Sequence, residues 1–170
     1  KNKKTQQKYI DFIRNLKFEQ SKLGFAGEGS SFIKDPKYKD WSGITIPWMA
    51  IGYESYMTPL QILNLYNTIA NNGQMMRPHI VKEIRSYGKT EKRLRPEIID
   101  RKLVSSKTVE LTQQLLERVV AGKNGTAKNI NTEHYAIAGK TGTSVINYIE
   151  HNSKDVVKQY RASFVGYFPA

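Results

Sequence analysis

The segment His134–Val145, HYAIAGKTGTSV, holds the residue types that best suit a chemical role. It places Lys140 between two glycines and then adds hydroxyl side chains. Glycine weakens a strand, and a lysine in an otherwise apolar run is costly to bury, so the pattern indicates a need for charge and for close backbone approach. Two interpretations follow: a phosphate-binding loop, or a strand edge that presents hydroxyls and an ammonium to an anionic substrate.

The phosphate-loop interpretation fails on spacing. A Walker loop has the pattern Gly-x-x-x-x-Gly-Lys-[Ser/Thr]. The chain has two Gly-Lys-Thr sequences, which begin at Gly139 and at Gly88. Where the Walker pattern needs its leading glycine, the first has His134 and the second has Glu83. We therefore favour a strand edge that binds an anion.

Lys140-Thr141-Gly142 matches the Lys-Thr-Gly motif of serine acyltransferases that react with penicillin. A tripeptide is weak evidence, but three longer segments support it: KYIDFIRNLKF, AIGYESYMTPLQILNLYNTIANNGQMMRPHIV and VVAGKNGTAKNI. With them, nearly the whole chain resembles the class B penicillin-binding proteins. NGTA followed by AGKTGTS favours the cell-division type over the elongation type. The upstream match disfavours the alternative of a glycine-kinked core strand whose lysine reaches solvent.

The resemblance implies a peptidoglycan D,D-transpeptidase, in which a serine attacks the D-Ala-D-Ala amide of a stem peptide and a neighbouring amine then takes the acyl group. Thr141 and Thr143 would bind the terminal carboxylate, and Lys140 would add positive charge and assist proton transfer. Gly142 would let the substrate backbone lie along the strand. The backbone N–H of Thr143 would be one of two oxyanion donors. Strand alternation would turn Ser144 to the other face.

The family nucleophile stands in Ser-x-x-Lys at the start of a buried helix. This spacing occurs at Ser31–Lys34 and at Ser86–Lys89. Asp35-Pro36 would end a helix that began at Ser31, and Ser86 precedes a glycine-containing turn, so neither serine suits the role.

The second family motif, Ser-x-Asn, is missing, because no serine has an asparagine two residues later. We therefore expect residues 1–170 to be the C-terminal portion of a transpeptidase domain, with the nucleophile outside the chain, and to be inactive in isolation. The expected partners are stem peptides, β-lactams and proteins of the division or elongation machinery. The expected location is the extracytoplasmic side of the inner membrane, with an N-terminal anchor outside the chain.

Two other functions stay open at this point. A penicillin-sensing receptor of the same fold would be acylated but would not crosslink. A basic nucleic-acid-binding module would fit the charge, although we expect no nucleic-acid partner. A hydrolytic relative, such as a carboxypeptidase or β-lactamase, fits TPLQ and ANNG less well.

The composition indicates a globular chain with a hydrophobic core. Of its 170 residues, 39% are hydrophobic and 11% aromatic, and the formal net charge is +12. The charge would attract an anionic partner, or it could serve solubility. The chain has no cysteine, which excludes disulfides, thiolate zinc sites and cysteine nucleophiles. No apolar run approaches the ~20 residues that span a bilayer.

Neither the histidines nor the basic segment indicates a further site. His79, His134 and His151 have no metal-ligand spacing, so no metal or cofactor is expected. The segment Lys82–Lys102 is basic but lacks the interleaved aromatic residues of a single-strand binder, so we interpret it as a solvated hairpin.

Residues 4–17 and 59–70 are predicted to be amphipathic helices. Thr58 is a good N-cap, Pro59 suits the first helical position, and Asn-Asn-Gly at 71–73 ends the second helix. Its expected core-facing residues are Ile62, Leu63, Tyr66, Ile69 and Ala70.

A third helix is predicted to begin at Ser105 or Ser106 and to end at Gly122 and Gly125. Its expected core-facing residues are Val109, Thr112, Leu115, Leu116, Val119 and Val120.

Extended segments separate and follow the helices. Residues 23–42 are predicted to form an exposed loop or hairpin, and the front half of GITIPWMAIGYESYM is predicted to be extended until Gly52 breaks the run. A hairpin is predicted with its turn at Tyr87-Gly88. Two further strands are predicted at Tyr135–Thr143 and Arg161–Phe168, joined by the polar segment 147–158. This order predicts an α+β fold, a mostly antiparallel sheet flanked by helices. The resemblance implies that it is part of a β-lactamase/transpeptidase-like fold.

Overall fold

The structure is a computed structural model that describes residues 3–145 and 159–170. It divides into two compact units, Lys1–Ser105 and Ser106–Ala170. The first contains α1 (Lys3–Asn15), η1 (Phe18–Gln20), β1 (Phe32–Ile33), α2 (Thr45–Ala50), β2 (Ser55–Tyr56), α3 (Pro59–Ala70), β3 (Met75–Met76), β4 (Glu83–Ser86), β5 (Lys89–Arg93) and β6 (Ile98–Asp100). The second contains α4 (Ser106–Ala121), η2 (Lys128–Ile130), β7 (Ala138–Val145) and β8 (Tyr160–Tyr167). The strand pairs of the described residues, β1–β2, β3–β6, β4–β5 and β7–β8, are all antiparallel.

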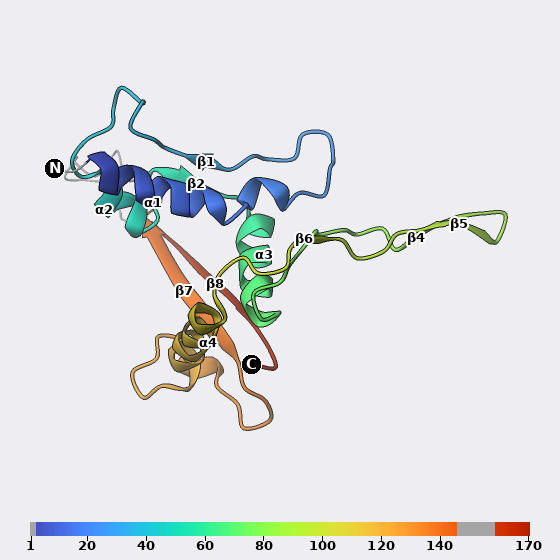
Figure 1. Ribbon diagram of the computed structural model, residues 1–170. Coiled ribbons are helices and arrows are strands. Elements are labelled where there is room, and N and C mark those ends of the chain that lie inside the picture. The colour runs from blue at the N-terminus through green and yellow to red at the C-terminus, as the bar shows by residue number, and fades with distance from the viewer. Residues whose placement is uncertain (1–2, 146–158) are drawn as a thin grey trace. The chain divides into compact units, whose positions relative to one another are not determined.

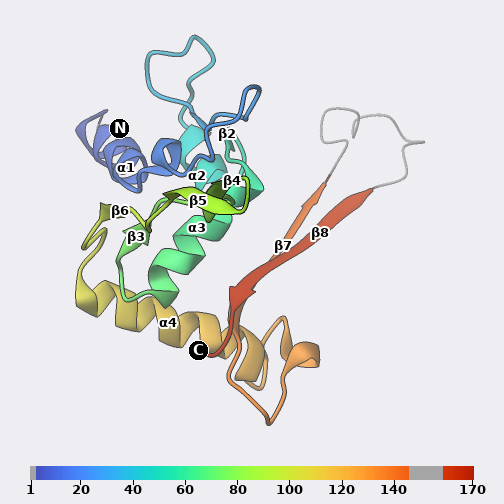
Figure 2. The same cartoon turned by 90° about the vertical axis from the view of Figure 1, so that its right-hand side faces the viewer.

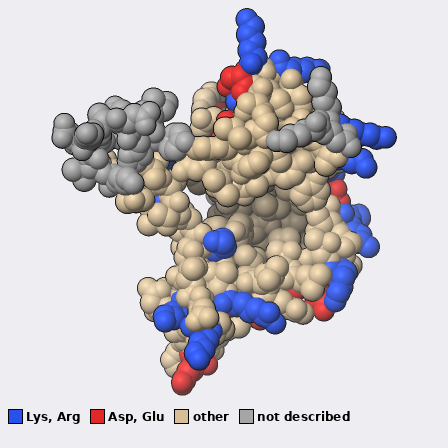
Figure 3. All heavy atoms as spheres, turned by 90° about the vertical axis from the view of Figure 1, so that its left-hand side faces the viewer, with Lys and Arg blue, Asp and Glu red and all other residues tan. Residues whose placement is uncertain are grey.

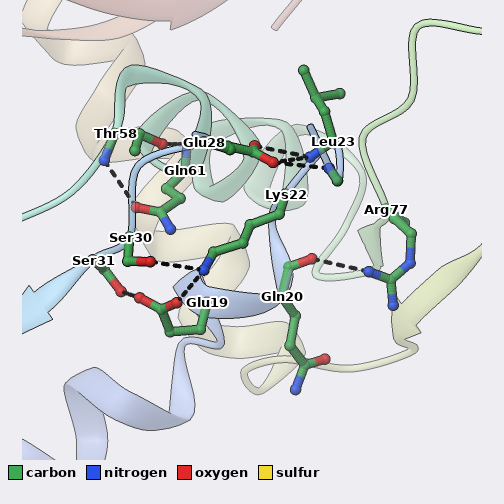
Figure 4. A network of polar contacts seen from close by, with 11 residues as sticks. Glu19, Gln20, Lys22, Leu23, Glu28, Ser30, Ser31, Thr58, Gln61 and Arg77 are labelled. Atoms are coloured by element: carbon green, nitrogen blue, oxygen red, sulfur yellow. Dashed lines mark hydrogen bonds and ion pairs between the residues drawn. The ribbon is translucent and has the colours of Figure 1, made fainter. Parts of the chain in front are cut away.

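Helix α3 begins and ends where the sequence predicted, and Figure 4 shows the contacts of Thr58 and Gln61 at its start. The Thr58 hydroxyl accepts a hydrogen bond from the Gln61 backbone N–H at 3.2 Å, and the Gln61 side chain accepts one from the Thr58 N–H at 2.8 Å. This capping box satisfies two backbone donors, and Pro59 lacks an N–H where none is needed. The chain leaves the helix through Gly73, whose φ is +88°.

The predicted apolar stripe of α3 is wrong in part. Ile69 is buried, but Ile62 and Leu63 are 37% and 50% exposed. The buried face instead carries Gln61, Asn64 and Thr68. Burial of these polar groups is tolerated because they are hydrogen-bonded: the Asn64 amide donates to the Ser21 hydroxyl at 2.8 Å and to the Met76 carbonyl at 3.0 Å, and the Thr68 hydroxyl donates to the Asn64 carbonyl at 2.7 Å.

Replacing Thr58 by alanine is expected to lower the free energy of unfolding by about 1 kcal/mol, because the Gln61 N–H loses its capping acceptor. Urea denaturation measures the change. Thr58→Ser keeps the hydroxyl and is the matched control. An equal loss in both variants would show that the threonine methyl, not the cap, stabilises this end of α3.

The segment predicted to be extended before Gly52 is helix α2. The β-branched residues Ile44, Thr45 and Ile46 are typical of a strand, but Pro47 falls in the first helical turn, where its missing N–H costs nothing. The Ser42 N–H donates to the buried Thr45 hydroxyl at 3.1 Å and supports this turn. Gly52, with φ +98°, breaks the run as predicted.

The strand–turn–strand prediction for the basic segment is confirmed. β4 and β5 form a hairpin that extends away from α3 within the first unit (Figure 1). Its turn residues Tyr87 and Gly88 have φ of +47° and +77°, a combination typical of the tight turns that match the twist of a hairpin. β5 is exposed along its whole length, and Glu83 forms ion pairs with Arg85 and Arg93.

Ion pairs and backbone donors hold several carboxylates of the first unit in their charged form. The Arg14 side chain and the Lys37 N–H lower the pKa of Asp35, and the Lys17 ammonium, 2.5 Å away, lowers that of Asp100. The backbone N–H of Leu23 is the largest cause of the lowered pKa of Glu28 (Figure 4).

The first unit is therefore expected to lose stability in acid. A carboxylate with a lowered folded-state pKa contributes stability above its unfolded pKa, and the contribution disappears as the pH falls below about 4. The thermal midpoint measured from pH 6 to pH 3 should fall at the acid end, and Asp100→Asn should make that fall shallower. A midpoint that is constant or rises on acidification would contradict this account.

In the second unit, α4 packs against one end of the β7–β8 hairpin (Figure 2). Val109, Leu116 and Val120 are buried as predicted, and Thr112 and Val119 are half-buried. Leu115 is 63% exposed, so its predicted burial is wrong. β7 begins three residues later than predicted and runs to Val145, and β8 matches its prediction within a residue at each end. The predicted connection at 147–158, including His151, lies outside the described residues.

Candidate functional site

Strand β7 carries the four residues singled out from the sequence. Lys140 is exposed, and its ammonium donates to the Thr141 carbonyl at 2.8 Å. Thr141 is half-buried, and Gly142 and Thr143 are exposed. Among the described residues β7 pairs with β8 on one edge and with no strand on the other. The lysine is thus neither buried in an apolar core nor part of an inner strand here.

Strand alternation sorts these side chains onto two faces. Thr141 and Thr143 share one face, and Lys140, Gly142 and Ser144 occupy the other. The register pairs Thr141 with Phe164 and Gly142 with Ser163.

Glycines of the hairpin have a packing role that the sequence did not reveal. A Cβ at Gly139 or at Gly166 would overlap the ring of Phe164 and a backbone carbonyl of the paired strand. Phe164 therefore lies across two residues without side chains and fixes how β7 and β8 pack. A Cβ at Gly142 would come within 2.7 Å of the Ser163 hydroxyl oxygen of β8, a contact that rotation of the Ser163 side chain would relieve.

Thr126 is a site residue that sequence reasoning missed. Its hydroxyl oxygen lies 2.8 Å from that of Thr141. The signal was present in the NGTA segment, which indicated the family and its cell-division type but gave no role for Thr126 itself. The two threonines are far enough apart in the chain that only the fold brings them together.

Tyr167 places a second unforeseen polar group in this unit. Its hydroxyl is buried and has no hydrogen-bond partner among the described residues. Burial raises its pKa, and the nearby Glu117 carboxylate raises it further. Burial and the Glu117 carboxylate of α4 thus both favour the neutral form of the hydroxyl.

Neither Ser-x-x-Lys match stands at the start of a helix. Ser31 precedes β1 and hydrogen-bonds to the Glu19 carboxylate, and Lys34 is almost fully buried in ion pairs with Asp40 and Glu54. Ser86 and Lys89 flank the β4–β5 turn. Both matches therefore lack the geometry of the family nucleophile.

Within residues 3–145 and 159–170, no cluster of His, Asp or Glu is arranged to hold a metal ion. In the same ranges, no helix has the length and apolar character to cross a membrane. On the face drawn in Figure 3, Lys and Arg side chains lie at several separate places, with uncharged surface between them.

Comparison with known proteins identifies the family. A family model described as the penicillin-binding protein transpeptidase domain matches residues 2–170. Penicillin-binding protein PbpB of Mycobacterium tuberculosis is 32% identical over 145 residues, 81% of this chain and 21% of the relative. Peptidoglycan D,D-transpeptidase FtsI of Buchnera aphidicola is 30% identical over 157 residues, 90% of this chain and 25% of the relative.

Solved structures agree with the sequence comparison. Penicillin-binding protein 3 of Mycobacterium tuberculosis, complexed with ampicillin, matches with a TM-score of 0.74 and 29% identity, over 94% of this chain and 36% of that chain. The transpeptidase domain of Burkholderia pseudomallei penicillin-binding protein 3 shares the fold with a TM-score of 0.69, and 45% of it is covered.

The chain belongs to the penicillin-binding protein transpeptidase domain family. The predicted resemblance to the class B proteins and the predicted partial transpeptidase-like α+β fold are both confirmed. The chain spans 21% and 25% of the length of the two curated relatives named above.

Proposed function

We propose that this chain is the carboxylate-binding and oxyanion-binding portion of a peptidoglycan D,D-transpeptidase that crosslinks stem peptides through a serine acyl-enzyme. One observation carries the proposal: Lys140-Thr141-Gly142-Thr143 forms a strand of an antiparallel pair with its lysine exposed and one edge unpaired by the described residues. This edge offers cationic charge and hydroxyls to the anionic end of a D-Ala-D-Ala peptide.

The direction of the backbone groups supports an oxyanion role for Thr143. The Ser163 hydroxyl of β8 approaches the Gly142 carbonyl at 3.5 Å, so the backbone of Gly142 is directed toward β8. Neighbouring residues of a strand direct their N–H and C=O groups to opposite sides. The N–H of Thr143 is then directed away from β8, toward the open edge, where a developing oxyanion could accept its hydrogen bond.

In this role each of the four residues has a separate function. The hydroxyls of Thr141 and Thr143 donate to the substrate carboxylate from one face. Lys140 lowers the energy of the bound anion, because a charge held near a protein surface interacts more strongly than in bulk water. Gly142 keeps the edge free of bulk so that the substrate backbone can approach it.

The nucleophile would come from outside residues 1–170, since neither Ser-x-x-Lys match has helical geometry and no Ser-x-Asn occurs. We infer that residues 1–170 are the C-terminal portion of the domain and are inactive in isolation. The names of the relatives FtsI and penicillin-binding protein 3 support a cell-division role with divisome partners. The similarity to these relatives also supports an extracytoplasmic location.

Acylation of the full protein by a fluorescent penicillin tests the proposal. The protein should become labelled on a denaturing gel, and excess ampicillin should prevent the labelling. Exchange of a labelled D-amino acid into a stem peptide separates a transpeptidase from a penicillin sensor, which would be acylated without exchange. Absence of labelling would overturn the proposal.

A further inference from the structure

The segment that connects α4 to β7 brings Thr126 into contact with the Lys-Thr-Gly strand. The two hydroxyl oxygens of Thr126 and Thr141 are 2.8 Å apart, a normal distance for an O–H···O hydrogen bond. Each hydroxyl has one hydrogen to donate and lone pairs that accept. If Thr126 donates to Thr141, the hydrogen of Thr141 is left free to point elsewhere.

The backbone on both sides of Thr126 is firmly held. Ala127 is 3% exposed, and its N–H donates to the Val119 carbonyl at 3.0 Å. The N–H of Gly125 donates to the Gly122 carbonyl at 2.8 Å. A Cβ at Gly125 would overlap the carbonyl oxygens of Val119 and Arg118, so no larger residue fits there without a backbone shift. Thr126 is therefore presented by a rigid connection between α4 and β7.

We propose that Thr126 is a positioning residue for the substrate carboxylate: it donates its hydrogen to the Thr141 hydroxyl and thereby directs the Thr141 hydrogen at the anion. This inference rests on the proposed function of Thr141. A chain of two hydroxyls that ends on an anion is polarised by the charge, so each bond strengthens the other. Without Thr126 the Thr141 hydroxyl would rotate freely and would have to be oriented when the substrate binds.

The test compares acylation rates of the full protein and its variants by a fluorescent penicillin. Thr126→Val should lower the second-order rate constant by about 3- to 10-fold, the value of one ordinary hydrogen bond, and Thr126→Ser should restore it. Because Thr126 acts through Thr141, adding Thr126→Val to Thr141→Val should cause no further loss.

A second probe separates positioning from loss of structure. A penicillin whose carboxylate is esterified lacks the anion that the hydroxyl pair serves, so Thr126→Val should leave its slow acylation nearly unchanged. Equal losses with both probes, additive losses in the double variant, or an unchanged rate in Thr126→Val would overturn the proposal. Failure of the unmodified protein to be acylated would instead overturn the proposed function itself.

Discussion

Replacing Thr141 by valine in the full protein is expected to slow acylation by penicillin about 10- to 100-fold, because a hydrogen bond to a charged group contributes about 1.5–3 kcal/mol. Valine has nearly the same shape as threonine, so the packing of β7 against β8 should survive. The change removes the hydroxyl that we assign to the substrate carboxylate and that Thr126 contacts.

The effect on folding should be small in comparison. Thr141 is half-buried, and its hydroxyl hydrogen-bonds to that of the exposed Thr126. The thermal midpoint should therefore change little, and Thr141→Ser, which keeps the hydroxyl, should retain most of the acylation rate. Equal losses in acylation and in stability for Thr141→Val would show that the threonine is structural.

Gly125→Ala is expected to lower the free energy of unfolding by about 1–3 kcal/mol, the usual cost of forcing extra volume into a packed site. The new methyl group would meet backbone atoms of Val119 and Arg118, which cannot rotate away as a side chain can. The relaxation that relieves this overlap must move Thr126, so acylation should slow as well. Urea denaturation and the acylation rate give the two readouts.

Gly43→Ala is the matched control, since a Cβ at Gly43 has no neighbour within 4 Å. It should leave both stability and acylation close to those of the unmodified protein. If Gly125→Ala behaved like Gly43→Ala, the connection between α4 and β7 would be far more pliable than its hydrogen bonds indicate.

The sequence predicted those features that are formed by residues close together in the chain. The cap at Thr58 and the turn at Tyr87-Gly88 depend on neighbouring residues, and both are found in the structure. The sequence predicted an extended segment in place of helix α2, because the β-branched residues of this segment favour a strand. Only Pro47, in the first turn, indicated the start of a helix.

Features that depend on distant partners could not be predicted. The polar buried face of α3 is stable because Asn64 finds Ser21 and the Met76 carbonyl, which lie elsewhere in the chain. The contact of Thr126 with Thr141 likewise needs α4, the loop after it and β7 in place. The Lys-Thr-Gly strand was recognisable because its chemistry requires adjacent residues of fixed type.

The position of the penicillin adduct in the full protein tests the central claim most directly. After labelling and proteolysis, mass spectrometry should find one acylated serine, in a peptide outside residues 1–170, and Lys140→Ala should greatly reduce its yield. An adduct on Ser31, Ser86 or another serine of this chain, or a yield independent of Lys140, would contradict the account.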